Sequence, residues 1–176
     1  MTNKKKGANQ ILGYTEKHLR VSRKALLNYY SKNARYLPRI SAAEYTDLIA
    51  LDHLCGHTNV LMKQVAQVPD IEVTLRTKSA YVDEILAHDG DNRVTIAVNF
   101  NPQSVIDRYE EGTASLRERI IAAQKVQAAK GFRLALVIEP VIKYPGYENE
   151  YVSLVKLLGK SLDLRRVADI AVGCVR

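Results

Sequence analysis

The polar side chains that could carry out chemistry in this sequence follow short apolar runs. Those runs are rich in β-branched residues, as expected for strands of a parallel sheet. The polar residues at their ends are Glu44, Arg76, Lys78, Asn99, Asn101 and Glu139. Carboxylates, a lysine and amides together suit a ligand that bears both an amino group and a carboxylate. If the strands are parallel neighbours, we expect these side chains to meet on one rim.

The segment from 93 to 131 indicates what positions such residues. Residues 93–98 are almost all apolar, and Pro102 ends the run because proline cannot donate to a strand ladder. Ser115 and Glu118 have the spacing of a capping box, which predicts the start of a long helix that Gly131 closes. A strand, a polar turn and a capped helix make a βα unit, in which function lies at the carboxyl end of the strand.

Strand-like runs alternate with helical patterns elsewhere in the chain. We expect further strands at 71–76, 132–138 and 169–172, helices at 81–87 and 150–158, and an edge strand or a lead-in at 36–41. Such alternation requires parallel pairing with right-handed crossovers, and therefore an α/β fold. A doubly wound sheet and a partial parallel (β/α) barrel both fit this pattern, and periodicity alone does not separate them.

Residues 47–65 read as one long helix whose weak point is Gly56. A glycine in a helix interior costs about 1 kcal/mol relative to alanine. His53 and His57 are four residues apart and could share one face of this helix, as two metal ligands would. No HExxH glutamate, CxxC pair or third ligand accompanies them, so we interpret them as helix-surface residues and expect no metal site. The inward positions should be Leu48, Leu51, Leu54, Leu61 and Val65.

Length and composition predict one globular, soluble domain with a sizeable core. The chain has 176 residues, of which 47% are hydrophobic, and no apolar run approaches the roughly 18 residues of a membrane span. The lysines at the N-terminus are not followed by the apolar segment of a secretory signal. Cys55 and Cys174 are far apart and show no disulfide-framework spacing, which favours a reducing, cytoplasmic location.

The positive charge is concentrated near the N-terminus. The first 40 residues contain ten Lys or Arg against the single acidic Glu16, a net charge of +9, so the other 136 residues carry −2 of the total +7. We therefore divide the chain into a basic arm with a helix, 1–35, and an α/β domain, 36–176. The arm suits phosphate backbones, with tyrosines available for stacking, or it is a solvated tail with one amphipathic helix over 15–30.

Five segments in register resemble the spore photoproduct lyase family of radical S-adenosylmethionine (SAM) proteins, including its DNA-repair-photolyase-like relatives. They are residues 43–54, 75–82, 99–102, 111–119 and 139–147, within a similarity that begins near Ile40. The resemblance implies a partial (β/α)₆ barrel of the radical SAM type. It also implies a 4Fe-4S iron–sulfur cluster, held by a CxxxCxxC loop, that cleaves SAM to a 5′-deoxyadenosyl radical. In that family the radical abstracts hydrogen from a thymine photoproduct in DNA.

The resemblance also assigns SAM-binding positions. Glu44 corresponds to the acidic end of a Gly-Glu motif that meets the SAM amino group, and Thr46 belongs to the same implied site. Lys78 corresponds to the lysine that faces the SAM carboxylate. Asn99 occupies a position near SAM where the family often has serine. We expect SAM as the cofactor and DNA as a partner, and no membrane.

Several family features are absent from these 176 residues. There is no CxxxCxxC motif, Ala43 replaces a glycine, and no hydrogen-donating cysteine lies near Glu44. The first strand and the C-terminal segment that contacts the DNA lesion also have no counterpart. We therefore expect a truncated, split or degenerate lyase that is inactive alone, or that needs a second polypeptide carrying the cluster loop. The alternatives are a non-catalytic nucleic-acid-binding module that uses the basic arm, and a subunit whose open sheet edge pairs with another chain.

Overall fold

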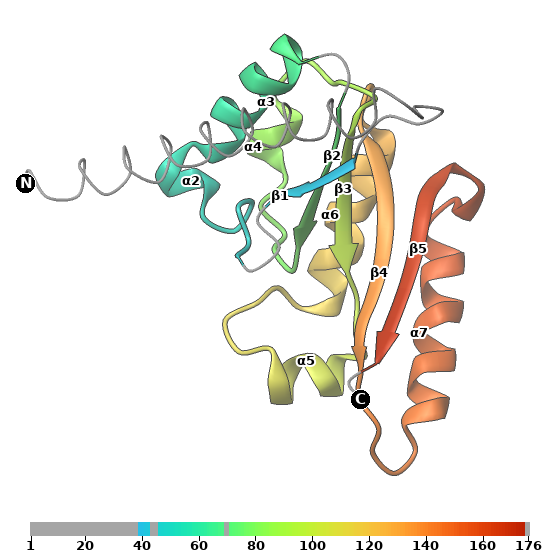
Figure 1. Ribbon diagram of the computed structural model, residues 1–176. Helices are drawn as coiled ribbons and strands as arrows, with labels where there is room; N and C mark the ends of the chain where they lie inside the picture. Colours follow the sequence, from blue (N-terminus) through green and yellow to red (C-terminus); the bar gives the residue numbers. More distant parts are fainter. Residues whose placement is uncertain (1–38, 43–45, 69–70, 175–176) are drawn as a thin grey trace, which may run out of the picture.

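A computed structural model of the protein describes residues 39–42, 46–68 and 71–174 (Figure 1). The described strands are β1 (Arg39–Ala42), β2 (Glu72–Thr77), β3 (Val94–Asn99), β4 (Arg133–Val141) and β5 (Val167–Cys174). They form one sheet in the order β1-β2-β3-β4-β5, and every neighbouring pair is parallel. A doubly wound sheet reverses its strand order at a switch point, whereas this order never reverses. The sheet is therefore the wall of a partial (β/α) barrel, and β1 is its edge strand among the described residues.

Helices cover one face of this wall, apart from α5 (Gln103–Tyr109), which lies near the carboxyl ends of the strands (Figure 1). The other described helices are α2 (Asp52–Cys55), α3 (His57–Gln67), α4 (Asp83–Leu86), α6 (Leu116–Ala128) and α7 (Tyr147–Ser161), with a short 3₁₀ helix at Leu164–Arg166 before β5. Figure 1 shows α6 behind the middle strands and α7 beside β5. The main core lies between strands and helices, and it includes Val73, Ile96 and Leu134 from the sheet and Ala123 and Leu158 from the helices. No helix of the described residues is long and apolar enough to cross a membrane.

The opposite face of the sheet combines small side chains with charged ones, among them Arg39, Arg76, Arg133 and Asp169. Ala97, Ala135 and Val137 form a separate small cluster there, and Ala171 packs against it. A cavity of about 210 Å³ lies over these residues. Since β3 has helices on one side and this face on the other, all six of its residues are buried, as its uninterrupted apolar pattern predicts.

The predicted capping box is confirmed at the start of α6. The Ser115 backbone N–H donates to Glu118 Oε2 at 2.8 Å, and the Glu118 backbone N–H donates to Ser115 Oγ at 3.4 Å. Gly131 follows the helix with φ of 78°, and a Cβ atom built on it would lie 2.6 Å from the carbonyl carbon of Gly90. The turn after α6 and the turn before β3 thus touch backbone to backbone, which requires glycine at this position.

The predicted single helix over 47–65 is wrong. Gly56 takes a left-handed conformation, with φ of 61°, and separates α2 from α3. The Asp52 carboxylate explains the break, because it accepts from the Thr58 backbone N–H at 2.8 Å and so caps the start of α3. Of the leucines expected to point inward, Leu51 and Leu54 are 48% and 73% exposed, while Leu48 and Leu61 are buried together with Val65.

The other differences concern element ends. β4 continues to Val141, past the expected stop at 138, because Val141 still pairs with Cys174 of β5 after a shift in register. α7 is longer than predicted at both ends and α4 is shorter. The expected helix over 15–30 and the basic arm over 1–35 lie outside the described residues. The division into 1–35 and 36–176 therefore stays a prediction.

Candidate functional site

A cleft lies where the carboxyl ends of β2, β3 and β4 meet. Its volume is about 780 Å³, and its polar lining includes Thr46, Asp47, Arg76, Lys78, Asn99 and Glu139. Three of the four predicted SAM-binding residues, Thr46, Lys78 and Asn99, therefore share one cleft. The fourth, Glu44, lies outside the described residues. Thr46 itself is exposed on the segment that follows the first strand.

Asp47 fixes the backbone that carries Lys78. Its Oδ2 atom accepts from Thr77 Oγ1 at 2.9 Å and from the Lys78 backbone N–H at 2.8 Å. The Lys78 carbonyl then accepts from the Ala114 backbone N–H at 3.1 Å. The end of β2 is thus tied to the loop that follows β1 and to the loop that precedes α6. Sequence reasoning assigned Asp47 no role, because its partners are about thirty residues away.

Asn99 presents an unpaired acceptor. Its Nδ2 atom donates to the Glu139 carbonyl at 2.7 Å, which joins the ends of β3 and β4. Its Oδ1 atom is buried and has no hydrogen-bond partner among the described residues. A buried polar atom left in this state costs about 1–3 kcal/mol, and such atoms in native proteins call for an explanation. Because Asn99 lines the cleft, a hydrogen-bond donor of a ligand would satisfy this atom.

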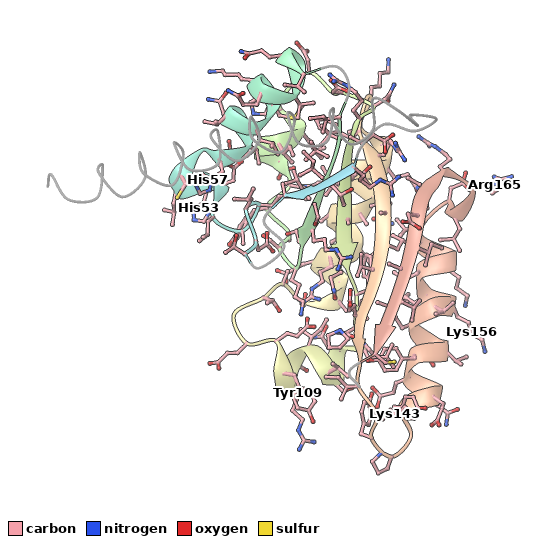
Figure 2. All side chains as sticks on the ribbon, viewed as in Figure 1. His53, His57, Tyr109, Lys143, Lys156 and Arg165 are labelled. Atoms are coloured by element: carbon pink, nitrogen blue, oxygen red, sulfur yellow. The ribbon has the colours of Figure 1, made fainter. Side chains whose placement is uncertain are left out.

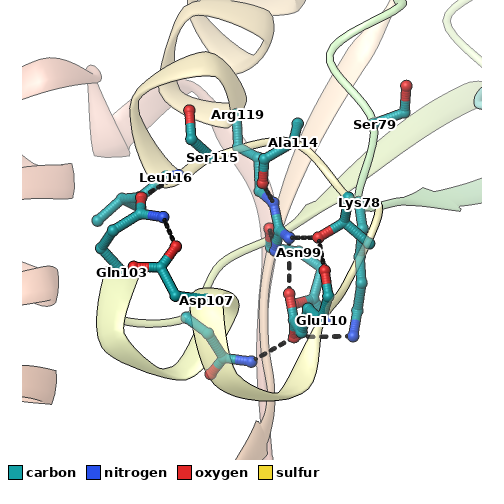
Figure 3. A network of polar contacts seen from close by, with 12 residues as sticks. Lys78, Ser79, Asn99, Gln103, Asp107, Glu110, Ala114, Ser115, Leu116 and Arg119 are labelled. Carbon is teal, nitrogen blue, oxygen red and sulfur yellow. Dashed lines mark hydrogen bonds and ion pairs between the residues drawn. The ribbon is translucent and has the colours of Figure 1, made fainter.

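A buried carboxylate lies next to the cleft (Figure 3). The Glu110 side chain is 4% exposed and accepts three hydrogen bonds: at Oε1 from Lys78 Nζ at 2.8 Å and Asn101 Nδ2 at 2.8 Å, and at Oε2 from Arg119 Nη2 at 2.6 Å. Burial alone would raise the pKa of Glu110, but these hydrogen bonds outweigh it and hold the pKa below its ordinary value. Glu110 is therefore ionised at neutral pH.

Arg119 anchors this carboxylate from within the protein. It is fully buried, although it lies on the helix that the capping box begins. Its Nε donates to the Ala114 carbonyl at 2.8 Å, its Nη1 to the Asn99 carbonyl at 3.2 Å and its Nη2 to Thr113 Oγ1 at 2.7 Å. Sequence reasoning missed both Glu110 and Arg119 as functional residues. A signal existed in the helical spacing. Leu116 packs against the core, and position 119 lies three residues later, on the same face of the helix.

The remaining predicted rim residues divide into two groups. Arg76 Nη1 and Glu139 Oε2 form an ion pair at 2.8 Å in the cleft, with both side chains about half exposed. Glu139 also packs against Gly173, where a Cβ atom would lie 2.7 Å from Glu139 Oε1. Asn101 is fully buried and contacts Glu110, so it supports the rim from beneath.

The donor set for an iron–sulfur cluster does not fit this chain. The two cysteines, Cys55 and Cys174, are free thiols on α2 and β5, whereas the cluster that the resemblance implies is held by three thiolates from one loop. Among the described residues, no three His, Cys, Asp or Glu side chains are grouped so that they could hold a metal ion.

The two histidines that could have been metal ligands lie on different helices (Figure 2). His53, on α2, is exposed and packs against the Tyr81 ring at a centroid distance of 5.4 Å. The surface interpretation is wrong for His57, which is buried on α3 with neither ring nitrogen hydrogen-bonded in the described part of the chain. The break at Gly56 separates them, because it ends the single helix face on which they were expected to meet.

The sequential parallel wall, with a cleft at its carboxyl rim, defines a partial (β/α) barrel protein. Within that class, residues 19–176 match the family model described as "Spore photoproduct lyase". The chain therefore belongs to the spore photoproduct lyase family.

Curated relatives agree with this assignment. Spore photoproduct lyase of Geobacillus sp. (strain Y412MC61) is 29% identical over 144 residues, which cover 81% of this chain and 41% of the relative. Spore photoproduct lyase of Bacillus subtilis (strain 168) is 29% identical over 136 residues, which cover 76% and 39%. The chain thus spans about two fifths of the length of these relatives.

Solved structures of spore photoproduct lyase share the fold. One, complexed with dinucleoside spore photoproduct, superposes with a TM-score of 0.70 at 26% identity, over 85% of this chain and 44% of that chain. A variant with bound AdoMet (SAM) and dinucleoside spore photoproduct gives the same TM-score and identity. The match confirms the partial barrel.

Proposed function

We propose that this chain binds SAM in the cleft at the carboxyl rim and forms the SAM-binding part of a DNA repair lyase of the spore photoproduct lyase type. The observation that carries the proposal is the unpaired, buried Oδ1 atom of Asn99 in the wall that it shares with Lys78. A related protein that binds AdoMet, superposed over most of this chain, supports it.

The side chains present suit the parts of SAM. The Lys78 ammonium has three donors, of which Glu110 receives one, and the side chain is 35% exposed, so it can donate to the SAM carboxylate. Asn99 Oδ1 can accept from a ligand N–H or O–H group, and the exposed Thr46 hydroxyl lies on the same cleft. We assign Glu44 to the SAM amino group. When bound, SAM supplies the adenosyl group on which radical SAM chemistry depends.

Calorimetric titration with SAM tests this proposal. We expect wild-type protein to bind SAM and Lys78→Ala to bind it about ten- to a hundredfold more weakly, since a hydrogen bond to a charged group contributes about 1.5–3 kcal/mol. Lys156→Ala is the control, because Lys156 is exposed on α7, away from the cleft (Figure 2). Absence of binding by wild-type protein, or equal losses in both variants, would contradict it.

The cluster has to come from outside these 176 residues. We infer that the chain is inactive alone and that a CxxxCxxC loop is supplied by a second polypeptide or a further segment. Among the described strands β1 pairs only with β2, so its other edge offers a place for one more strand. Anaerobic reconstitution with iron and sulfide should leave the isolated chain without a stoichiometric cluster. Finding such a cluster would refute this part of the proposal.

A second candidate function rests on the charge of the N-terminal segment. The net charge of +9 over the first 40 residues favours a non-catalytic nucleic-acid-binding module. In that case, deletion of residues 1–35 should abolish DNA binding and flatten the log–log dependence of affinity on salt. An unchanged slope would exclude the arm as the binding element.

A further inference from the structure

We propose that Glu110, held by Arg119, is the positioning residue that presents Lys78 to the carboxylate of the bound ligand. This inference rests on the proposed function and deepens it, because it names what makes the cleft specific for a ligand that bears a carboxylate. The juxtaposition of three buried or half-buried ionic groups at the ends of β2, α5 and α6 is what supports it (Figure 3).

Lys78 depends on Glu110 for its orientation. Glu110 Oε1 is the acceptor of Nζ among the described residues, and it comes from a residue 32 positions further along the chain. A free lysine side chain loses rotamer entropy when it is fixed in one conformation. Because the contact with Glu110 forms during folding, the Lys78 side chain loses this rotamer entropy before any ligand binds. Two Nζ hydrogens remain for the ligand.

Glu110 is itself fixed from two sides. Arg119 holds Oε2 at 2.6 Å and is in turn locked by the Ala114 and Asn99 carbonyls. On the other side, Asn101 donates to Oε1 and accepts at Oδ1 from the Tyr151 hydroxyl at 3.0 Å. The Glu110 carboxylate therefore cannot move with the Lys78 side chain, and it holds the Lys78 ammonium in a fixed position.

The cluster of Lys78, Glu110 and Arg119 carries a net positive charge that suits a ligand carboxylate, in a cleft that the Asp47 and Glu118 carboxylates also line. Two cations, Lys78 and Arg119, share the single carboxylate of Glu110, which leaves one net positive charge. Arg119 is fully buried, so Lys78 is the member of the cluster that remains open to the cleft. A ligand carboxylate would complete the balance.

Three roles for Glu110 predict different results, and two ligands separate them. Decarboxylated SAM differs from SAM in the carboxylate, so the ratio of the two affinities reports the contribution of Lys78. Glu110→Asp keeps the charge but withdraws the carboxylate by one methylene. If Glu110 positions Lys78, we expect Glu110→Asp to lower the affinity ratio about tenfold, as Lys78→Ala does, and to change the binding of decarboxylated SAM less than about twofold.

The other outcomes overturn the inference. If Glu110 acted only through its charge, Glu110→Asp would leave the ratio unchanged and Glu110→Gln would raise it. If Glu110 only held the loop together, Glu110→Asp would weaken both ligands equally. Glu111→Asp is the matched control, because the neighbouring Glu111 is exposed and should leave the ratio unchanged.

A measurement without ligand keeps this test separate from the proposed function. Lysines carrying ¹³C-methyl groups keep their charge, and NMR relaxation of those groups reports side-chain motion. Lys78 should move less than the exposed Lys156 in wild-type protein and as freely as Lys156 in Glu110→Asp. Equal mobility in wild-type protein would overturn the positioning role. If wild-type protein does not bind SAM but Lys78 is ordered in this way, the proposed function fails and the positioning contact stands.

Discussion

The Arg119 side chain connects more parts of the surrounding structure than any neighbouring side chain. It is fully buried, and it joins one carboxylate, two backbone carbonyls and one hydroxyl. Burying a charge costs several kcal/mol unless it is paired and hydrogen-bonded, and here both conditions are met. Removing one partner therefore lowers the stability of the folded protein more than the absence of both partners would, because the other charge stays buried alone.

Replacement of Arg119 should therefore be strongly destabilising. We expect Arg119→Met to lower the free energy of unfolding by about 3–5 kcal/mol, since Glu110 would lose its buried ionic partner. Arg117→Met, on the exposed side of the same helix, should change it by no more than about 0.5 kcal/mol. Urea denaturation of both variants measures the difference, and similar losses would show that Arg119 is not the anchor of the loop.

Glu110 should make the protein sensitive to acid. Burial raises the pKa of Glu110, but hydrogen bonds from Lys78, Asn101 and Arg119 outweigh it and hold the pKa in the folded protein below its ordinary value. The stabilisation is present above the unfolded-state pKa and is lost as the pH falls through the folded-state pKa. Urea midpoints measured from neutral to acidic pH should fall more steeply for wild-type protein than for Glu110→Gln. Parallel curves would contradict this expectation.

Gly56 acts at the scale of the element, because it ends α2 and lets α3 start in a new direction. With φ of 61° it occupies a conformation that costs L-residues about 1–2 kcal/mol. Gly159 gives the opposite case, since it lies inside α7, where an added Cβ would meet Leu164 Cδ1 at an ordinary distance of 3.7 Å.

These two glycines should respond to alanine with opposite signs. Gly56→Ala should destabilise the protein by about 1 kcal/mol, and Gly159→Ala should stabilise it by up to about 1 kcal/mol through helix propensity. Chemical denaturation of the two variants tests this. Stabilisation by Gly56→Ala would instead favour one continuous helix over 47–65.

The elements that the sequence predicts well are those whose signals are local. The apolar run of β3 and the Ser115–Glu118 capping box depend on residues within a few positions of one another, and both are confirmed. The break at Gly56 was not predictable from periodicity, because Asp52 caps α3 from the preceding helix.

In the candidate site, too, the sequence predicts what depends on strand position and misses what depends on contacts between distant segments. Parallel pairing was enough to bring Lys78 and Asn99 to one rim, so strand-end position predicted their shared cleft. The cluster of Glu110 and Arg119 depends on contacts between three loops and a helix, and no single segment of the sequence contains its pattern.

At the scale of the whole molecule, successive βα units are held together by backbone contact between glycines. Gly90 precedes β3 and Gly131 precedes β4, and a Cβ on Gly131 would overlap the Gly90 backbone at 2.6 Å. Gly112 also has a positive φ, of 73°, but no atom lies within 4 Å of an added Cβ. Substitution of Gly112 by alanine therefore measures the cost of the left-handed backbone conformation alone, without a contribution from steric overlap.

Alanine at position 131 should separate the two units. We expect Gly131→Ala to cost about 3 kcal/mol, from both the left-handed backbone and the overlap, and Gly112→Ala about 1 kcal/mol from the backbone alone. Thermal unfolding of the two variants gives the comparison. Equal losses would mean that the two turns can move apart without penalty.

The order of the strands has a consequence for how the protein can be divided. Each described strand lies beside the described strand that precedes it in the chain, so none of these five is inserted between two that were made earlier. The wall can grow from the ribosome by successive addition, and a cut between two units severs a single ladder of hydrogen bonds. A separate polypeptide could therefore extend the wall by lying along its first strand, without threading through any part already folded.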